Sequence, residues 1–232
     1  MLEAKAHLLS EADLHPACVQ VRSMMWDKFT QDMVDRRIPT DDWARWSIVL
    51  QWVKGTPSLL DVGTAHGTFL NSLACANTAK HMVGIDIRDY SLYSELFPGF
   101  ERIIADAEQM PFSDGEFETV TCMEVIEHLP DEKLERVLAE LRRVAARRLI
   151  ISVPFCEGIP LYKGHSQRFD PERIKLLFPN ASYTILMKEK RGGTPWLMID
   201  EPRRQTRAGA KRNPAPAWRK KLWHIRKRVG LA

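Results

Sequence analysis

The sequence predicts an α/β fold in which a doubly wound, mostly parallel sheet is completed by an antiparallel last strand. Short apolar runs rich in β-branched residues recur from residue 58 onward, and helical stretches separate several of them. Strands that alternate with helices form parallel sheets with right-handed crossovers. The last two runs are separated only by Arg-Gly-Gly, which favours an antiparallel hairpin. The expected strands cover 58–63, 81–86, 101–106, 117–123, 147–155, 182–190 and 194–202, and the clearest helix covers 131–145.

Length and composition indicate an ordinary globular protein. The chain has 232 residues, of which 44% are hydrophobic and 28% charged, enough for one sizeable domain. No apolar run reaches the roughly 20 residues of a membrane span, and the first residues lack the apolar core of a signal peptide, so we expect a cytoplasmic protein. The four cysteines are scattered, which favours neither a zinc knuckle nor a disulfide framework.

The two ends of the chain differ from its centre. Apolar residues at helical spacing over 19–34 and 41–53 predict an N-terminal helical lid over residues 1–54. The α/β domain would cover 55–202. The basic tail, residues 203–232, contains eleven Lys or Arg and no acid, whereas the other 202 residues carry 23 basic and 30 acidic side chains, a net charge of −7. Such a tail suits a flexible segment, an anionic membrane surface or nucleic acid.

A glycine-containing turn at residues 59–70 follows the first expected strand and precedes a helix. Gly63 and Gly67 permit a tight turn and a close approach of a ligand to the backbone. Asp86 follows 23 residues after Gly63 at the end of the next strand, near the roughly 20-residue offset of a carboxylate that binds ribose hydroxyls. Asp106 ends the third strand, where its carboxylate can accept a hydrogen bond from an adenine amino group.

These segments, with the run from Ala105 to Leu129, resemble the small-molecule class I methyltransferases of the UbiE/UbiG type, which use S-adenosylmethionine (SAM) and have a Rossmann-like fold. The resemblance covers about residues 45–155. It implies that the glycine loop holds the amino-acid end of SAM, that the next acid holds the ribose, and that the following segments contact adenine. The implied SAM-binding residues are Asp61, Gly63, Thr64, Gly67, Asp86, Ile87, Asp106 and Ala107. Ala65 departs from the family, which usually has glycine there. The alternative interpretation is an NAD-binding domain, but in such a domain the segment at 105–112 would have no role.

The segment after the fourth expected strand predicts the chemistry. Glu124, Glu127 and His128 stand at i, i+3 and i+4, which in a helical turn would place all three on one face. With His165 on the loop after the fifth strand, this set resembles the magnesium site of RNA 3′-terminal 2′-O-methyltransferases. We therefore expect Glu124, Glu127, His128 and His165 to bind Mg²⁺ or Mn²⁺, with Glu127, His128 and His165 acting in catalysis. Two alternatives remain: Glu127 and His128 merely stabilise the start of a helix, or His165 is a general base without a metal.

The resulting hypothesis is an O-methyltransferase that acts on a vicinal diol, such as a saccharide, a glycolipid or a glycosylated metabolite. The alternatives are methylation of a phenolic or quinone-type ring, methylation of an RNA 3′ end, and a non-catalytic SAM-binding protein. The sequence does not decide which acceptor is used, what the basic tail does, or whether the chain forms a homodimer.

Overall fold

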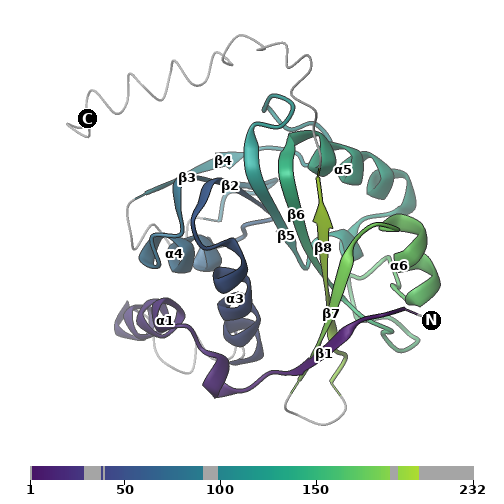
Figure 1. The fold of residues 1–232 in the computed structure, drawn as a ribbon, viewed down its shortest axis with the longest axis horizontal. Coiled ribbons are helices and arrows are strands. Elements are labelled where there is room, and N and C mark those ends of the chain that lie inside the picture. The colour runs from purple at the N-terminus through teal and green to yellow at the C-terminus, as the bar shows by residue number, and fades with distance from the viewer. Residues whose placement is uncertain (1, 29–37, 39, 91–98, 189–192, 204–232) are drawn as a thin grey trace.

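A mixed sheet of eight strands forms the centre of the described protein (Figure 1). The computed structural model describes residues 2–28, 38, 40–90, 99–188 and 193–203. The strands are β1 (Lys5–Leu8), β2 (Thr56–Val62), β3 (Ala79–Asp86), β4 (Phe100–Ile104), β5 (Phe117–Met123), β6 (Ala145–Pro154), β7 (Ser182–Met187) and β8 (Trp196–Pro202). The helices are α1 (Pro16–Lys28), α3 (Thr40–Val53), α4 (Thr68–Cys75), α5 (Asp131–Val144) and α6 (Pro171–Leu177), with short 3₁₀ turns η1 (Glu11–Asp13) and η2 (Ile126–His128).

The strand order is β1-β7-β8-β6-β5-β2-β3-β4, and among the described strands β8 alone runs antiparallel to its neighbours. This arrangement confirms the predicted fold, a Rossmann-like, mostly parallel sheet with an antiparallel last strand. The chain passes from β2 outward to β3 and β4, then returns to the other side of β2 with β5 and β6. Ligands of such sheets bind where the order reverses, at the carboxyl ends of the strands. Here that point lies between β2 and β5.

The first strand corrects the expectation that the N-terminal region, residues 1–54, is helical. Residues Lys5–Leu8 pair in parallel with β7, while α1 and α3 are helices as predicted. All four residues of β1 are exposed, so backbone hydrogen bonds rather than apolar burial hold this strand. Strand β1 thus forms the edge of the sheet next to β7, and it is short, as edge strands often are.

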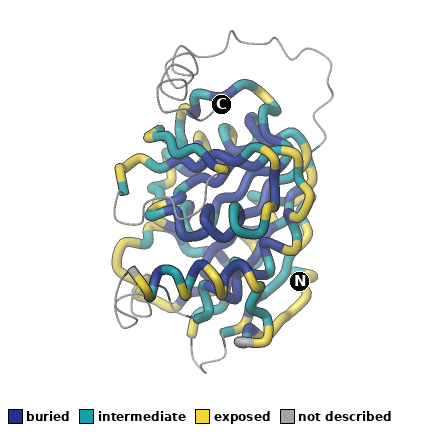
Figure 2. The backbone as a smooth tube through the Cα atoms, turned by 90° about the vertical axis from the view of Figure 1, so that its left-hand side faces the viewer, coloured by how far each residue is buried: buried dark blue, intermediate teal, exposed yellow. Residues whose placement is uncertain are grey.

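The core has two parts, one on each face of the sheet. Figure 1 shows α1, α3 and α4 on one side and α5 and α6 on the other, and Figure 2 shows the buried strands between them. Alternate residues of a strand enter different parts: Leu197 and Ile199 of β8 pack toward α5 and α6, whereas Trp196 and Met198 pack toward α3. Fully burying such a side chain contributes about 1.5–3 kcal/mol.

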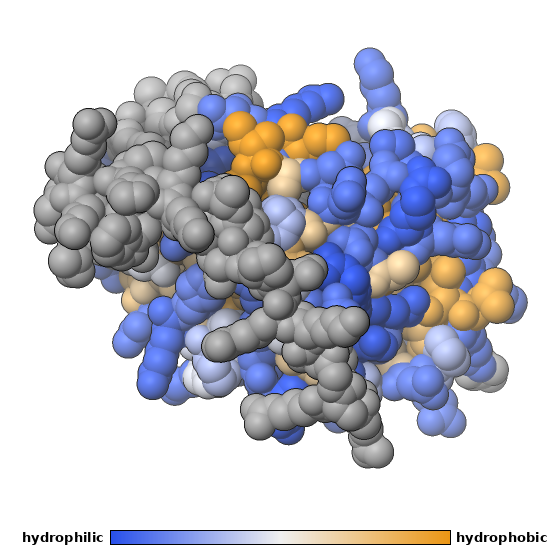
Figure 3. Space-filling model, turned by 90° about the horizontal axis from the view of Figure 1, so that it is seen from above, coloured by the Kyte–Doolittle hydropathy of each residue, from blue (hydrophilic) through white to orange (hydrophobic). Residues whose placement is uncertain are grey.

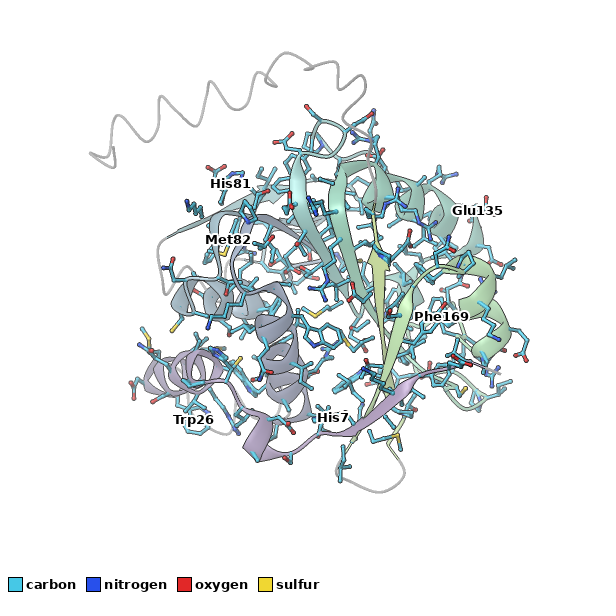
Figure 4. The ribbon with its side chains drawn as sticks, viewed as in Figure 1. His7, Trp26, His81, Met82, Glu135 and Phe169 are labelled. Carbon is cyan, nitrogen blue, oxygen red and sulfur yellow. The ribbon has the colours of Figure 1, made fainter. Side chains whose placement is uncertain are left out.

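Helix α5 shows why the sequence pattern predicts this packing. Its buried residues recur at helical spacing and face the sheet, whereas Glu135 is exposed and lies on the outer side of the helix (Figure 4). The buried set is Leu134, Val137, Leu138, Leu141 and Val144. Met82 and Phe169, also labelled in Figure 4, are buried in the two different parts of the core.

The surface seen from above is mainly hydrophilic, with apolar side chains in small groups among polar ones (Figure 3). Within the described part of the chain, no helix has both the length and the apolarity needed to cross a bilayer. Apart from Arg203, the basic tail lies outside the described residues, and so do the expectations made for it.

Candidate active site

Two adjoining cavities open at the carboxyl ends of β2, β3 and β5, and Gly63, Ala65 and Glu124 line both of them. The cofactor cavity, about 570 Å³, is lined by five of the residues expected to bind SAM, namely Gly63, Asp86, Ile87, Asp106 and Ala107. The lid cavity, about 460 Å³, lies under α3 and is also lined by Asp42, Arg45, Trp46, Asp61, Thr64 and Phe69. The two adjoining cavities are thus lined by every predicted SAM residue except Gly67.

The glycine loop has the backbone geometry that the sequence requires. Gly63 has a φ of 77°, and a Cβ atom there would lie 2.2 Å from a methyl carbon of Val125. Gly67 has a φ of 78° and stands at the N-cap of α4. Ala65, where the family usually has glycine, also has a left-handed φ, 45°. Its amide donates to Asp86 Oδ2 at 2.9 Å and its carbonyl accepts from Arg102 at 2.7 Å, so neighbouring side chains hold the loop.

The acidic residues of this region differ in their surroundings. Asp61 is buried, and burial raises its pKa to about 7, although the hydrogen bond from Thr121 acts in the opposite direction. Asp86 is more open: its Oδ1 accepts from the amide of Arg88 at 3.1 Å, and each oxygen keeps a lone pair for a ribose hydroxyl. Ile87 beside it is 62% exposed yet lines the cofactor cavity, an apolar surface suited to a planar base.

Glu124 does not lie on one helical face with Glu127 and His128, so that prediction is wrong. The turn η2 starts only at Ile126, and Glu124 has a left-handed φ of 56°. Its carboxylate accepts from Ser152 Oγ at 2.9 Å and from Trp196 Nε1 at 2.7 Å, and it forms an ion pair with Arg45 at 3.1 Å. These partners engage both oxygens, so Glu124 joins α3, β6 and β8.

The other three residues of the expected metal set do converge. Glu127, His128 and His165 each offer a ligand atom within 4.8 Å of the others. Glu127 is buried, and burial, with the charge of Glu124 as the next cause, holds its pKa well above the usual range for a carboxyl. Among the described residues, Glu127 Oε2 has no hydrogen-bond partner. A buried acceptor without a donor is costly unless a ligand satisfies it.

The loop between β6 and α6 brings His165 to this position. The amides of Ser166 and Gln167 both donate to the carbonyl of Glu127, at 2.7 and 3.0 Å. His128 Nδ1 lies 2.9 Å from the carbonyl oxygen of Gly164. The imidazoles of His128 and His165 then meet edge to face, with ring centroids 4.9 Å apart.

Sequence reasoning missed two participants, Arg45 and Glu157. Arg45 reaches Glu124 from α3, and Glu157 Oε2 lies 2.7 Å from His165 Nδ1. Neither belongs to a spaced motif, since Arg45 precedes the α/β domain and Glu157 stands in an irregular loop. His7 and His81, labelled in Figure 4, lie on β1 and β3 and line neither cavity.

Comparison with known proteins supports the family resemblance. Residues 60–150 match the family described as methyltransferase domain. A ubiquinone biosynthesis O-methyltransferase of Aromatoleum aromaticum is 34% identical over 94 residues, which cover 35% of this chain and 39% of that protein. A protein of the same name from Hahella chejuensis is 34% identical over 151 residues, 62% of this chain and 57% of the relative. The chain therefore spans about two fifths of the length of the first relative and under two thirds of the second.

Solved structures share the fold at low sequence identity. The N-methyltransferase NodS of Bradyrhizobium japonicum, in complex with S-adenosylhomocysteine (SAH), has a TM-score of 0.60 and 15% identity, covering 82% of this chain and 100% of that one. Magnesium protoporphyrin IX methyltransferase of Synechocystis, with bound SAM, has a TM-score of 0.54 and 18% identity, covering 79% and 97%. Residues 60–150 thus match a methyltransferase domain, and the solved methyltransferases share the Rossmann-like fold of the chain.

Proposed function

We propose that the protein is an O-methyltransferase that acts on one of two neighbouring hydroxyls of its acceptor, with a divalent cation at the site. The observation that carries this proposal is the convergence of Glu127, His128 and His165, because His128 also lines the cofactor cavity. An acceptor held at these residues would therefore lie beside the methyl donor.

The cofactor cavity suits SAM as methyl donor. Gly63 lets the ligand approach the backbone, Asp86 offers carboxylate oxygens for the ribose, and Ile87 offers an apolar surface for adenine. In the reaction, a lone pair of the acceptor oxygen attacks the methyl carbon while the carbon–sulfur bond breaks. The bonding electrons stay on sulfur, SAH leaves, and the hydroxyl proton passes to solvent. The chain's part is to align the two reactants.

The three converging residues suit Mg²⁺ or Mn²⁺. Glu127 supplies an oxygen that has no hydrogen-bond partner among the described residues, and His128 and His165 supply nitrogens. The carboxylate oxygen is the kind of ligand that these ions prefer, and the two imidazoles can complete the set. A bound ion would act as a Lewis acid that lowers the pKa of a neighbouring hydroxyl and as a template for two adjacent oxygens. Glu124 is not a ligand in this proposal, because Arg45, Ser152 and Trp196 hold its carboxylate.

The lid cavity suits a ring-shaped acceptor. Its walls include Trp46 and Phe69, whose ring centroids are 6.1 Å apart, while Asp42 and Arg45 add polar groups. Such walls fit a saccharide, our leading class, or a catechol, which is also a vicinal diol. The second candidate function, methylation of a phenolic ring, is favoured by the relatives named ubiquinone biosynthesis O-methyltransferase.

The first prediction tests the cation. Transfer of a labelled methyl group from SAM to catechol and to methyl glucoside should stop in EDTA and return with Mg²⁺. Glu127→Ala and His165→Ala should each lower turnover about 100-fold, the scale of lost electrostatic stabilisation. SAH binding, measured by calorimetry, should survive EDTA because the residues proposed to contact SAM are not cation ligands.

Matched controls make this result specific. Glu135→Ala, on the exposed side of α5, should keep full activity. Phenol, with a single hydroxyl, should react far more slowly than catechol. Full activity of cation-free protein in EDTA would refute the proposed requirement for a cation. If His165→Ala then recovered activity at higher pH, His165 would be a general base.

A further inference from the structure

Glu157 forms a partly buried hydrogen bond with His165. The two residues stand on the loop between β6 and α6, and their side chains are 9% and 11% exposed. Glu157 Oε2 lies 2.7 Å from His165 Nδ1. The second oxygen, Oε1, accepts from the backbone amide of Tyr162 at 2.9 Å. Both oxygens of this carboxylate are therefore occupied by groups of its own loop.

This bond determines which nitrogen of His165 carries the proton. In a neutral imidazole, a carboxylate that accepts from Nδ1–H leaves Nε2 with its lone pair free. His128 follows the same pattern, because its Nδ1 faces the carbonyl oxygen of Gly164, which can only accept. Its Nε2 lies 3.9 Å from Glu127 Oε1. Each imidazole thus has a partner on Nδ1, which leaves Nε2 as the nitrogen available to a ligand.

We propose that Glu157 is the positioning residue of the site: it fixes the tautomer and orientation of His165 so that Nε2 presents a lone pair beside Glu127 and His128. Ligating histidines commonly donate their other N–H to a carboxylate, which orients the ring. The consequence for a bound cation rests on the proposed function, whereas the tautomer of His165 does not.

Glu157→Gln is the sharpest test, because it keeps the shape of the side chain and changes one atom. The amide has one accepting oxygen, but Tyr162 N and His165 Nδ1 both require an acceptor. With its oxygen on Tyr162, the glutamine turns its NH₂ group toward Nδ1. The proton of His165 should then move to Nε2, which blocks that nitrogen as a ligand.

The tautomer can be read in cation-free protein by long-range ¹H–¹⁵N NMR of the histidine rings. His165 should have its proton on Nδ1 in the parent chain and on Nε2 in Glu157→Gln. Glu135→Gln, an exposed matched control, should leave the spectrum unchanged. SAH binding within about twofold of the parent would show that each variant is folded. An unchanged His165 tautomer in folded Glu157→Gln would overturn the proposal.

Binding of Mn²⁺ alone, followed by electron paramagnetic resonance, gives the second readout. Glu157→Gln should weaken Mn²⁺ binding about 10- to 100-fold, the usual effect of losing such a partner. Glu157→Asp keeps an acceptor for Nδ1–H and should restore both the tautomer and most of the affinity. If Asp behaved like Gln in both measurements, the role of Glu157 would be structural and the proposal wrong. A parent chain that binds no Mn²⁺ would refute the cation site, while the NMR result would still decide the role of Glu157.

Discussion

At the scale of single residues, Asp61 links the stability of the protein to its proposed cofactor site. Burial raises its pKa to about 7, whereas an aspartate in an unfolded chain titrates near 4. Between these values the folded protein binds a proton that the unfolded chain releases. The contribution of Asp61 to the free energy of unfolding therefore falls as the pH rises from about 4 to about 7, and it stays low above that window.

Asp61→Asn should remove this dependence. The variant keeps an acceptor for the hydroxyl of Thr121, 2.8 Å from Oδ1, but carries no buried charge. We expect it to exceed the parent chain in free energy of unfolding by roughly 1–3 kcal/mol at pH 8 and by much less at pH 5. Urea unfolding at both pH values measures the difference.

The control for this experiment is the exposed residue Asp89. Asp89→Asn should have the same free energy of unfolding as the parent chain at both pH values. SAH affinity of Asp61→Asn should fall, because the family resemblance assigns Asp61 to the amino-acid end of SAM. An equal stability difference at pH 5 and pH 8 would show that Asp61 titrates as it does in the unfolded chain.

Residue patterns in the sequence predicted the site only where the local backbone was also predictable. The glycine turn and the acids at strand ends identify Gly63, Asp86 and Asp106, because strand ends follow from apolar periodicity. Glu124 was misplaced because its spacing to Glu127 assumed a helix, whereas its left-handed backbone precedes η2. Glu157 depends on an irregular loop, for which no periodic pattern exists.

At the scale of elements, Arg45 ties α3 to the sheet next to the site. Its guanidinium is 5% exposed, donates to Ser152 at 2.8 Å, pairs with Glu124 and lies over the ring of Trp196. A single side chain of the N-terminal region thereby contacts groups on β6 and β8 and the residue after β5. This network also holds Glu124 in its left-handed conformation.

A double-mutant cycle with Arg45→Met and Glu124→Gln should show strong coupling between the two residues. Breaking a buried ion pair by removing one partner costs about 3–5 kcal/mol when the other charge is left uncompensated. Arg45 also pairs with Asp42 at 2.9 Å, and the side chain of Glu124 is 23% exposed, so each single change should cost less than this. Removing both should cost less than the sum of the single effects, with a coupling of about 1–3 kcal/mol in urea unfolding.

Arg147 with Glu118 provides the matched control pair, since their side chains are 74% and 36% exposed and the pair should couple by less than about 1 kcal/mol. Additive effects of the Arg45 and Glu124 changes would contradict a shared network.

Elements with strong periodicity were predictable, and the short edge strand was not. Helix α5 and strands β2 to β8 carry apolar residues at the spacing of their structure, so burial agrees with local preference. Strand β1 has four exposed residues, and only its pairing with β7 makes it a strand. Such an element depends on a distant partner, which a local pattern does not contain.

At the scale of the whole molecule, the described residues up to Arg203 already contain the eight-stranded sheet, both parts of the core and both cavities. Arg203 itself belongs to this body, because its amide donates to the carbonyl of Arg147 at 2.7 Å and its guanidinium binds Glu201 at 2.9 Å. The chain can therefore be cut after Arg203 without removing a described contact of the sheet.

Truncation after Arg203 should leave the melting temperature within about 2 °C of the full chain and SAH affinity within about twofold, since the contacts that determine both are retained. If the basic residues beyond Arg203 bind anionic membranes or nucleic acid, the truncation should abolish binding to anionic vesicles or to RNA. Binding of the full chain should then weaken as the salt concentration is raised. Differential scanning fluorimetry, calorimetry and vesicle sedimentation measure these effects.

Truncation after Asp200 is the matched comparison: it removes Glu201, which pairs with Arg142 at 2.9 Å, and should lower the melting temperature clearly. A drop of about 10 °C after the first truncation would show that the tail packs on the body and that the domain extends beyond Arg203.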